Sequence, residues 1–95
     1  MIVGILAITE DQLPAAHNAA MVYDVRATVD AREYTFRVSI SIVQLGDQKV
    51  ASANFCDDQS KDVFRWHQVF IPQICQLVHA VHNGHSLPFP VYLKE

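Results

Sequence analysis

The chain has 95 residues, of which 51% are hydrophobic and 18% are charged. This length allows one domain with a buried core, and the composition excludes a disordered or collagen-like chain. The net charge is -3 and the seven Lys and Arg residues never form a run, which argues against nucleic acid as a partner because phosphate binding needs a dense basic patch. We therefore predict a single domain over residues 1–95.

Neither a membrane span nor a disulfide framework is predicted. The apolar run Ile2–Ile8 is far shorter than the roughly 20 residues that cross a bilayer, and no basic residue precedes it as in a signal peptide. The two cysteines, Cys56 and Cys75, are too few to staple a small secreted domain. We expect a cytoplasmic protein with free thiols.

The first predicted element is a strand over Ile2–Ile8. Its apolar side chains occupy both alternating faces, so both faces need cover. The following segment, Thr9–Ala20, starts with a capping-box pattern but contains Pro14. We predict a connection there, with one helical turn at most after Pro14.

Two strands follow, at Met21–Val29 and Glu33–Val43. Apolar and polar residues alternate in both, which places the apolar residues on one face of a sheet. The second of these strands has the longest alternation and is predicted to be the central strand of an antiparallel sheet, with the following residues on its apolar face: Tyr34, Phe36, Val38, Ile40 and Ile42.

Two lengths are open for the loop between these strands. A two-residue loop at Asp30 and Ala31 would set Asp24 opposite Arg37, which is favourable, but would force Ala31 to positive φ. A four-residue loop over residues 30–33 avoids that strain. Because the loop contains no glycine, the four-residue loop is preferred.

A second hairpin is predicted with a four-residue loop over residues 44–47, where Gly46 can take a left-handed conformation. That loop aligns Ile40 with Ala51 and Val38 with Ala53. The alanines are small, and they leave room for a helix against this edge of the sheet.

The helix is predicted over Lys61–Asn83, ending at Gly84. Pro72 would kink it or split it into two abutting helices. Trp66 is expected in the core. The apolar stripe recurs at steps of three and four residues: Val63, Trp66, Phe70, Ile74, Leu77, Val78 and Val81.

The last segment, His85–Glu95, is held extended by Pro88 and Pro90 and is predicted either to close an edge of the core or to add a short strand over Val91–Leu93. Together these elements predict an α+β domain of two layers. An antiparallel sheet of about four strands is packed on one face by one long C-terminal helix.

One cluster of potential metal ligands appears, at the predicted helix end: Cys75, His79, His82 and His85. Thiolate and imidazole are the ligands that zinc prefers, so zinc is the cofactor to test. The alternative is an ordinary helix end, because the helix dipole favours histidines there and a buried thiol behaves as a small hydrophobic group.

Other reactive groups are interpreted as structural. Cys56 precedes a helix N-terminus, which would activate a thiol, but the adjacent Asp57 and Asp58 oppose this effect. The carboxylates of Asp57, Asp58 and Asp62 are typical of a solvated helix start.

The sequence favours a small interaction protein that self-associates. A strand with two apolar faces suggests a symmetric dimer through strand 1, with interface residues Val3, Ile5, Phe89 and Tyr92. The alternative is a monomer in which the tail covers strand 1. A metal- or ligand-binding protein and a small enzyme are the other function classes, and the enzyme ranks last because no catalytic triad or carboxylate pair appears.

Overall fold

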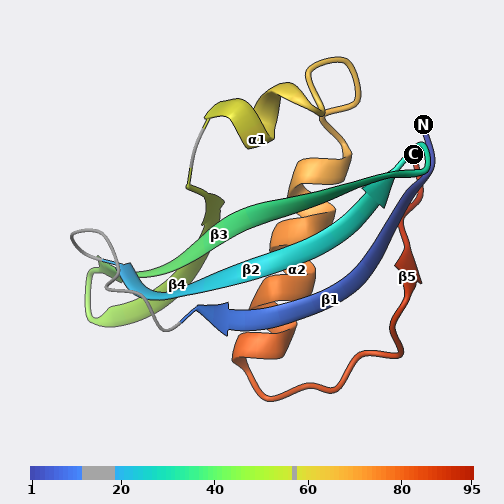
Figure 1. Cartoon of the computed structure of the whole chain (residues 1–95). Coiled ribbons are helices and arrows are strands. Elements are labelled where there is room, and N and C mark those ends of the chain that lie inside the picture. Colours follow the sequence, from blue (N-terminus) through green and yellow to red (C-terminus); the bar gives the residue numbers. More distant parts are fainter. Residues whose placement is uncertain (12–18, 57) are drawn as a thin grey trace.

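The computed structural model describes residues 1–11, 19–56 and 58–95. Five antiparallel strands in the order β4-β3-β2-β1-β5 curl into a half-barrel, and helix α2 lies in its concavity (Figure 1). The elements are β1 (Val3–Asp11), β2 (Ala19–Val29), β3 (Arg32–Leu45), β4 (Gln48–Phe55), α1 (Asp58–Asp62), α2 (Phe70–His82) and β5 (Val91–Tyr92).

The predicted fold class was therefore wrong. The protein is mostly an antiparallel sheet of five strands, and no long helix covers it, because α2 has only 13 residues. Residues 63–69 interrupt the predicted helix with tight turns, in which the N–H of Phe64 donates to the carbonyl of Lys61 at 3.0 Å and that of His67 to Phe64 at 3.0 Å. Pro72 lies in the first turn of α2, where a backbone N–H has no helical partner to lose.

Because of these turns, the prediction that Trp66 lies in the core was wrong. Trp66 is 84% exposed and does not belong to the core, whereas Phe64 is fully buried. Beyond residue 70 the helical periodicity holds, since Phe70, Ile74 and Val78 are buried. The end at Gly84 is confirmed, because this residue takes φ 87° and the N–H of His85 bonds the carbonyl of Ala80 at 3.0 Å.

A β-bulge in β1 explains the two apolar faces of the first strand. The register with β2 shifts between Ile5 and Ala7, so Leu6 is the extra residue. The shift changes which alternating set faces inward. Val3 and Ile5 point into the core before the bulge and Ile8 after it, with exposed fractions of 1%, 0% and 8%.

The loop between β2 and β3 has two residues, not the four that we predicted. Asp30 and Ala31 take φ of 49° and 69°, the two positive values of a type I′ turn. Asp24 accordingly pairs with Arg37 across the strands, and their side chains approach to 3.5 Å. Arg37 also donates to the Asp11 carboxylate, so pairing on the outer face accompanies the strained turn.

The register of the second hairpin was also wrong, by two residues. Leu45 pairs with Gln48 around a two-residue turn, so Ile40 lies opposite Ala53 and Ile42 opposite Ala51. Gly46 supplies the one positive φ, 60°, as in a type II′ turn. The shorter turn lengthens the β3–β4 ladder and carries it past α2 (Figure 1).

The strain at Ala31 gives a direct prediction. Ala31→Gly should raise the free energy of unfolding by about 0.5–1 kcal/mol, because glycine adopts φ near 69° without the steric cost that alanine has there. Gly46→Ala is the mirror control and should lower it by about 1 kcal/mol, since open space surrounds Gly46 and only its φ is restrictive. Chemical denaturation measures both variants, and a loss of stability in Ala31→Gly would contradict the turn geometry.

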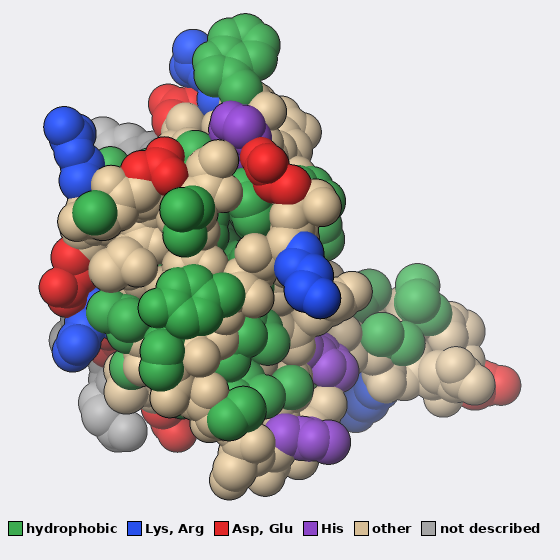
Figure 2. Space-filling view, turned by 90° about the vertical axis from the view of Figure 1, so that its right-hand side faces the viewer, with side chains coloured by type: hydrophobic (Ala, Val, Ile, Leu, Met, Phe, Trp, Pro, Cys, Tyr) green, Lys and Arg blue, Asp and Glu red, His purple; other side chains and the backbone are tan. Residues whose placement is uncertain are grey.

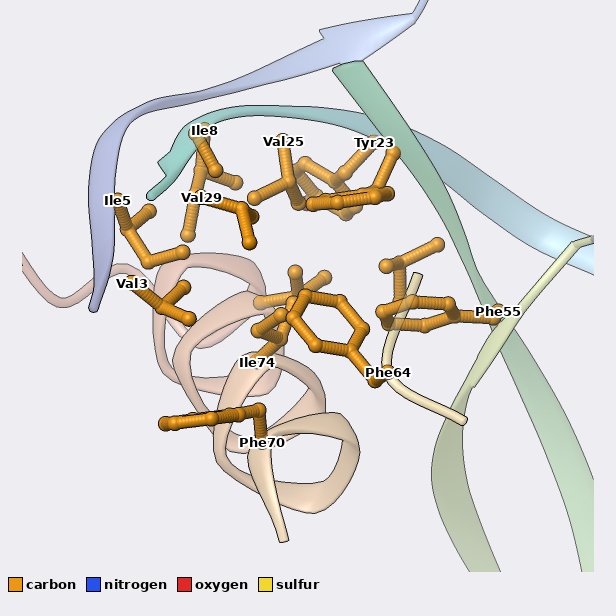
Figure 3. Packing of buried hydrophobic residues seen from close by; sticks show 14 of the residues in the cluster. Val3, Ile5, Ile8, Tyr23, Val25, Val29, Phe55, Phe64, Phe70 and Ile74 are labelled. Carbon is orange, nitrogen blue, oxygen red and sulfur yellow. The ribbon is translucent and has the colours of Figure 1, made fainter. Parts of the chain in front are cut away.

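The core lies between the concave face of the sheet and α2. Figure 3 shows side chains from β1 and β2 pointing toward Phe64, Phe70 and Ile74. The predicted inward face of β3 is confirmed over its first part, since Phe36, Val38 and Ile40 are buried, while Ile42 is 49% exposed.

The C-terminal tail closes one edge of the sheet. β5 pairs antiparallel with β1, with Tyr92 opposite Gly4, and the N–H of Leu93 donates to the carbonyl of Val3 at 2.9 Å. The predicted short strand is confirmed. The predicted turn after Pro14 lies outside the described residues.

Candidate docking groove

A groove of about 470 Å³ runs between the outer strand β4 and helix α2. One wall is β4 over residues 51–54. The other wall is a stripe of α2 at steps of about four residues, formed by Ile71, Pro72, Cys75, Gln76 and His79. The sequence predicted that the small side chains of Ala51 and Ala53 would let a helix lie close against this edge. In the structure these side chains instead leave the space between β4 and α2 unfilled, which forms the groove.

The backbone of β4 is available along the groove. Within the described part of the chain, β4 is the last strand of the sheet and pairs only with β3. The N–H of Cys56 bonds the carbonyl of Arg37 at 2.9 Å, and alternate residues of an antiparallel ladder point to opposite sides. The backbone groups of Lys49, Ala51, Ala53 and Phe55 therefore point away from β3.

The groove is uncharged. The described residues that line it include no Asp, Glu, Lys or Arg, and one thiol and one imidazole are its reactive groups. Burial raises the pKa of the Cys75 thiol, and the charge of Lys61 opposes this shift only in part. A raised thiol pKa is the opposite of what a nucleophilic cysteine requires.

The four predicted metal ligands do not form one cluster. Cys75 and His79 line the groove, and Nδ1 of His79 lies 3.1 Å from Nδ2 of Asn83. His82 turns to the sheet, where its Nδ1 lies 3.2 Å from the hydroxyl of Tyr23, and His85 is exposed beyond Gly84. Among the residues described, no three His, Cys, Asp or Glu side chains lie close enough together to hold a metal ion. Zinc binding stays a prediction.

The carboxylates near α1 carry ion pairs. Asp58 lies 3.7 Å from Lys61, and Asp62 lies 3.3 Å from Arg65. Asp57 lies outside the described residues. Cys56, at the end of β4, is an exposed free thiol.

Two of the four predicted interface residues are in the core. Val3 and Ile5 are covered by the chain itself, and β5 occupies the edge of β1 that we expected a second copy to take. Phe89 packs partly against the core. Tyr92 is 64% exposed, and its ring lies over Gly4, where an added Cβ would be 2.8 Å from Cε1 of Tyr92.

The sequence reasoning missed an exposed apolar surface on the distal part of the β3–β4 hairpin. We call residues 42–51 the arm. Figure 2 shows hydrophobic side chains on the part of the surface that projects from the body of the molecule. The exposed large hydrophobic residues of the arm are Ile42 (49%), Val43 (42%), Leu45 (60%) and Val50 (41%). The sequence did indicate this exposed surface, because Ile42 and Val43 are consecutive apolar residues and therefore point to opposite faces at the end of the strand.

No protein-family model, curated protein or solved structure matches this chain. No helix among the described residues is long and apolar enough to cross a bilayer.

Proposed function

We propose that this protein is a non-catalytic interaction module that binds an extended segment of polypeptide along β4. The segment would add a strand to the sheet, with α2 packing over its side chains. The observation that supports this proposal is the outer edge of β4, which pairs with no strand among the described residues and borders a groove with a helical second wall.

The backbone supplies the affinity in this mode of binding. A segment opposite residues 49–55 meets the outward groups of four residues, and each net hydrogen bond contributes about 0.5–1.5 kcal/mol. Alternate side chains of the segment enter the groove. Because the described lining of the groove holds no Asp, Glu, Lys or Arg and is partly formed by alanines, we expect small or apolar side chains at those positions.

The thiol chemistry of the groove favours binding over catalysis. Cys75 and His79 share the groove, but the raised pKa of Cys75 keeps its thiol protonated at neutral pH. A cytoplasmic location remains part of the proposal, and the two free cysteines support it.

Peptide selection followed by thiol alkylation tests the proposal. Octapeptides selected from a displayed random library on the purified protein should slow the reaction of Cys75 with iodoacetamide, since Cys75 lines the groove. At a peptide concentration about ten times Kd, mass action predicts roughly tenfold slower alkylation. Cys56, an exposed thiol beyond β4, serves as the internal reference and should react at its original rate.

A matched pair of variants locates the binding edge. Ala51→Pro removes an N–H that points away from β3, so the ladder with β3 stays intact while peptide binding should be lost. Ala51→Ser keeps the N–H and should bind normally. Selected peptides that bind Ala51→Pro equally well, or that leave Cys75 as reactive as before, would place the binding site elsewhere and contradict the proposal.

A further inference from the structure

Within the described ranges 1–11, 19–56 and 58–95, the part of the arm beyond Ser41 pairs with no third strand. Among the described residues, the pairing of β2 with β3 extends to Ala19 and Ser41, and beyond Ser41 the described pairs of the hairpin are those between β3 and β4. Isolated two-stranded ribbons are marginally stable in water, and a third strand or a packed helix is needed to stabilise them. The arm also exposes apolar side chains on both faces, Ile42 on one and Val43 and Leu45 on the other.

The two edges of the sheet differ in their protection against pairing. β5 has two residues and is preceded by Pro88 and Pro90, which cannot donate backbone hydrogen bonds. β4 has eight residues, no proline and one charged side chain, Lys49. An edge without these protective features is a template for another strand.

We propose that the strand received by β4 is the β4 strand of a second copy of this chain, giving a symmetric dimer with a continuous sheet. This inference rests on the function proposed above and names the partner. In an antiparallel pair related by a two-fold axis, residues 48–50 of one copy lie opposite residues 52–54 of the other, or opposite residues shifted from these by two positions along the strand. Residues 49–53 of each copy would then run along the groove of the partner, and the two-stranded part of each arm would gain a third strand.

The sequence of β4 is compatible with pairing to itself. The backbone groups that point away from β3 belong to odd-numbered residues of β4, so an odd-numbered residue of one copy must pair with an odd-numbered residue of the other. Among the registers that satisfy this condition, the two with the longest overlap place Ala51 or Ser52 on the two-fold axis. Both side chains are small and uncharged. The register with Ser52 on the axis fits the groove, because it sets Ala51 and Ala53 of one copy opposite Ala53 and Ala51 of the other. It places Lys49 opposite Phe55, outside the groove lining, so no charge enters the groove and no like charges are opposed.

Charge-swap variants at Ser52 test the dimer. Ser52 is partly exposed on the convex face, so a charged side chain there leaves the core unchanged. In either register the two copies of position 52 are opposite or diagonal neighbours, within about 8 Å. Sedimentation equilibrium of the full chain should show a dimer, and Ser52→Glu or Ser52→Lys alone should weaken dimerisation by about tenfold or more at low salt. An equimolar mixture of the two variants should restore it.

A wild-type mass of one chain at several hundred micromolar protein overturns the dimer, and so does a dimer that Ser52→Glu and Ser52→Lys leave equally strong. The peptide selection then decides the proposed function separately, because peptides that protect Cys75 in a monomeric protein would show that β4 receives a different polypeptide. Circular dichroism checks that both variants are folded, and Ala51→Pro, which removes an edge N–H without adding charge, provides an independent route to the monomer.

Discussion

Replacing Phe64 with alanine should lower the free energy of unfolding by about 3–5 kcal/mol, the usual cost of removing a buried aromatic ring. Phe64 is fully buried although it lies in the turns between α1 and α2. Its ring centroid lies 5.2 Å from that of Phe36, 5.9 Å from Phe70 and 6.3 Å from Phe55. The side chain therefore joins β3, β4 and α2 in one aromatic cluster, which the substitution would leave with a cavity.

Trp66→Ala is the matched control, two residues away in the same turns. Because Trp66 is 84% exposed, its loss should change the free energy of unfolding by less than about 0.5 kcal/mol. Urea denaturation followed by far-UV circular dichroism measures both variants without relying on tryptophan fluorescence. A larger cost at Trp66 than at Phe64 would restore the continuous helix that the sequence suggested and would refute the observed turns.

Replacing Ile5 with asparagine should destabilise the protein by about 4 kcal/mol or more. Ile5 is fully buried, so the variant loses the apolar contacts of isoleucine and also buries an amide without a designed partner. This cost is a large part of the stability of a typical domain, so partial unfolding at 37 °C is expected.

Ile2→Asn is the control for the same chemistry at the same end of the sheet. Ile2 is 71% exposed, so the substitution should cost less than about 0.5 kcal/mol. Thermal unfolding compares the two variants. Similar melting temperatures for Ile5→Asn and wild type would mean that the bulged β1 strand does not point Ile5 into the core.

The local pattern of the sequence was sufficient for the strands. The alternation in residues 21–29 and 33–43 predicted β2 and β3 and identified which side chains of both strands face the core, because the period of two is a property of the extended chain itself. The prolines around Phe89 similarly indicated an extended tail with a short strand. The small side chains of Ala51 and Ala53 indicated where a helix would face the sheet, but the groove that remains between them was not predicted.

The length of the helix could not be read from periodicity. Val63 and Trp66 lie at helical spacing from Phe70, but burying Phe64 in the aromatic cluster requires turns that point Trp66 to solvent. The hairpin registers depend on cross-strand pairing as well as on turn strain. The strained turn at Ala31 occurs together with the pairing of Arg37 with Asp24 of β2 and Asp11 of β1. These choices compare interactions between distant residues, and local propensity carries no information about them.

The sequence by itself thus determined the strand faces, the extended tail and the small residues of β4. The tertiary structure alone decided which strand ends the sheet among the described residues. Both β1 and β4 were candidates for an open edge, and β5 pairs with β1 because the chain returns across the half-barrel after α2 (Figure 1). Strand order depends on the path of the whole chain. An edge strand can receive another strand only where no strand of its own sheet already pairs with it.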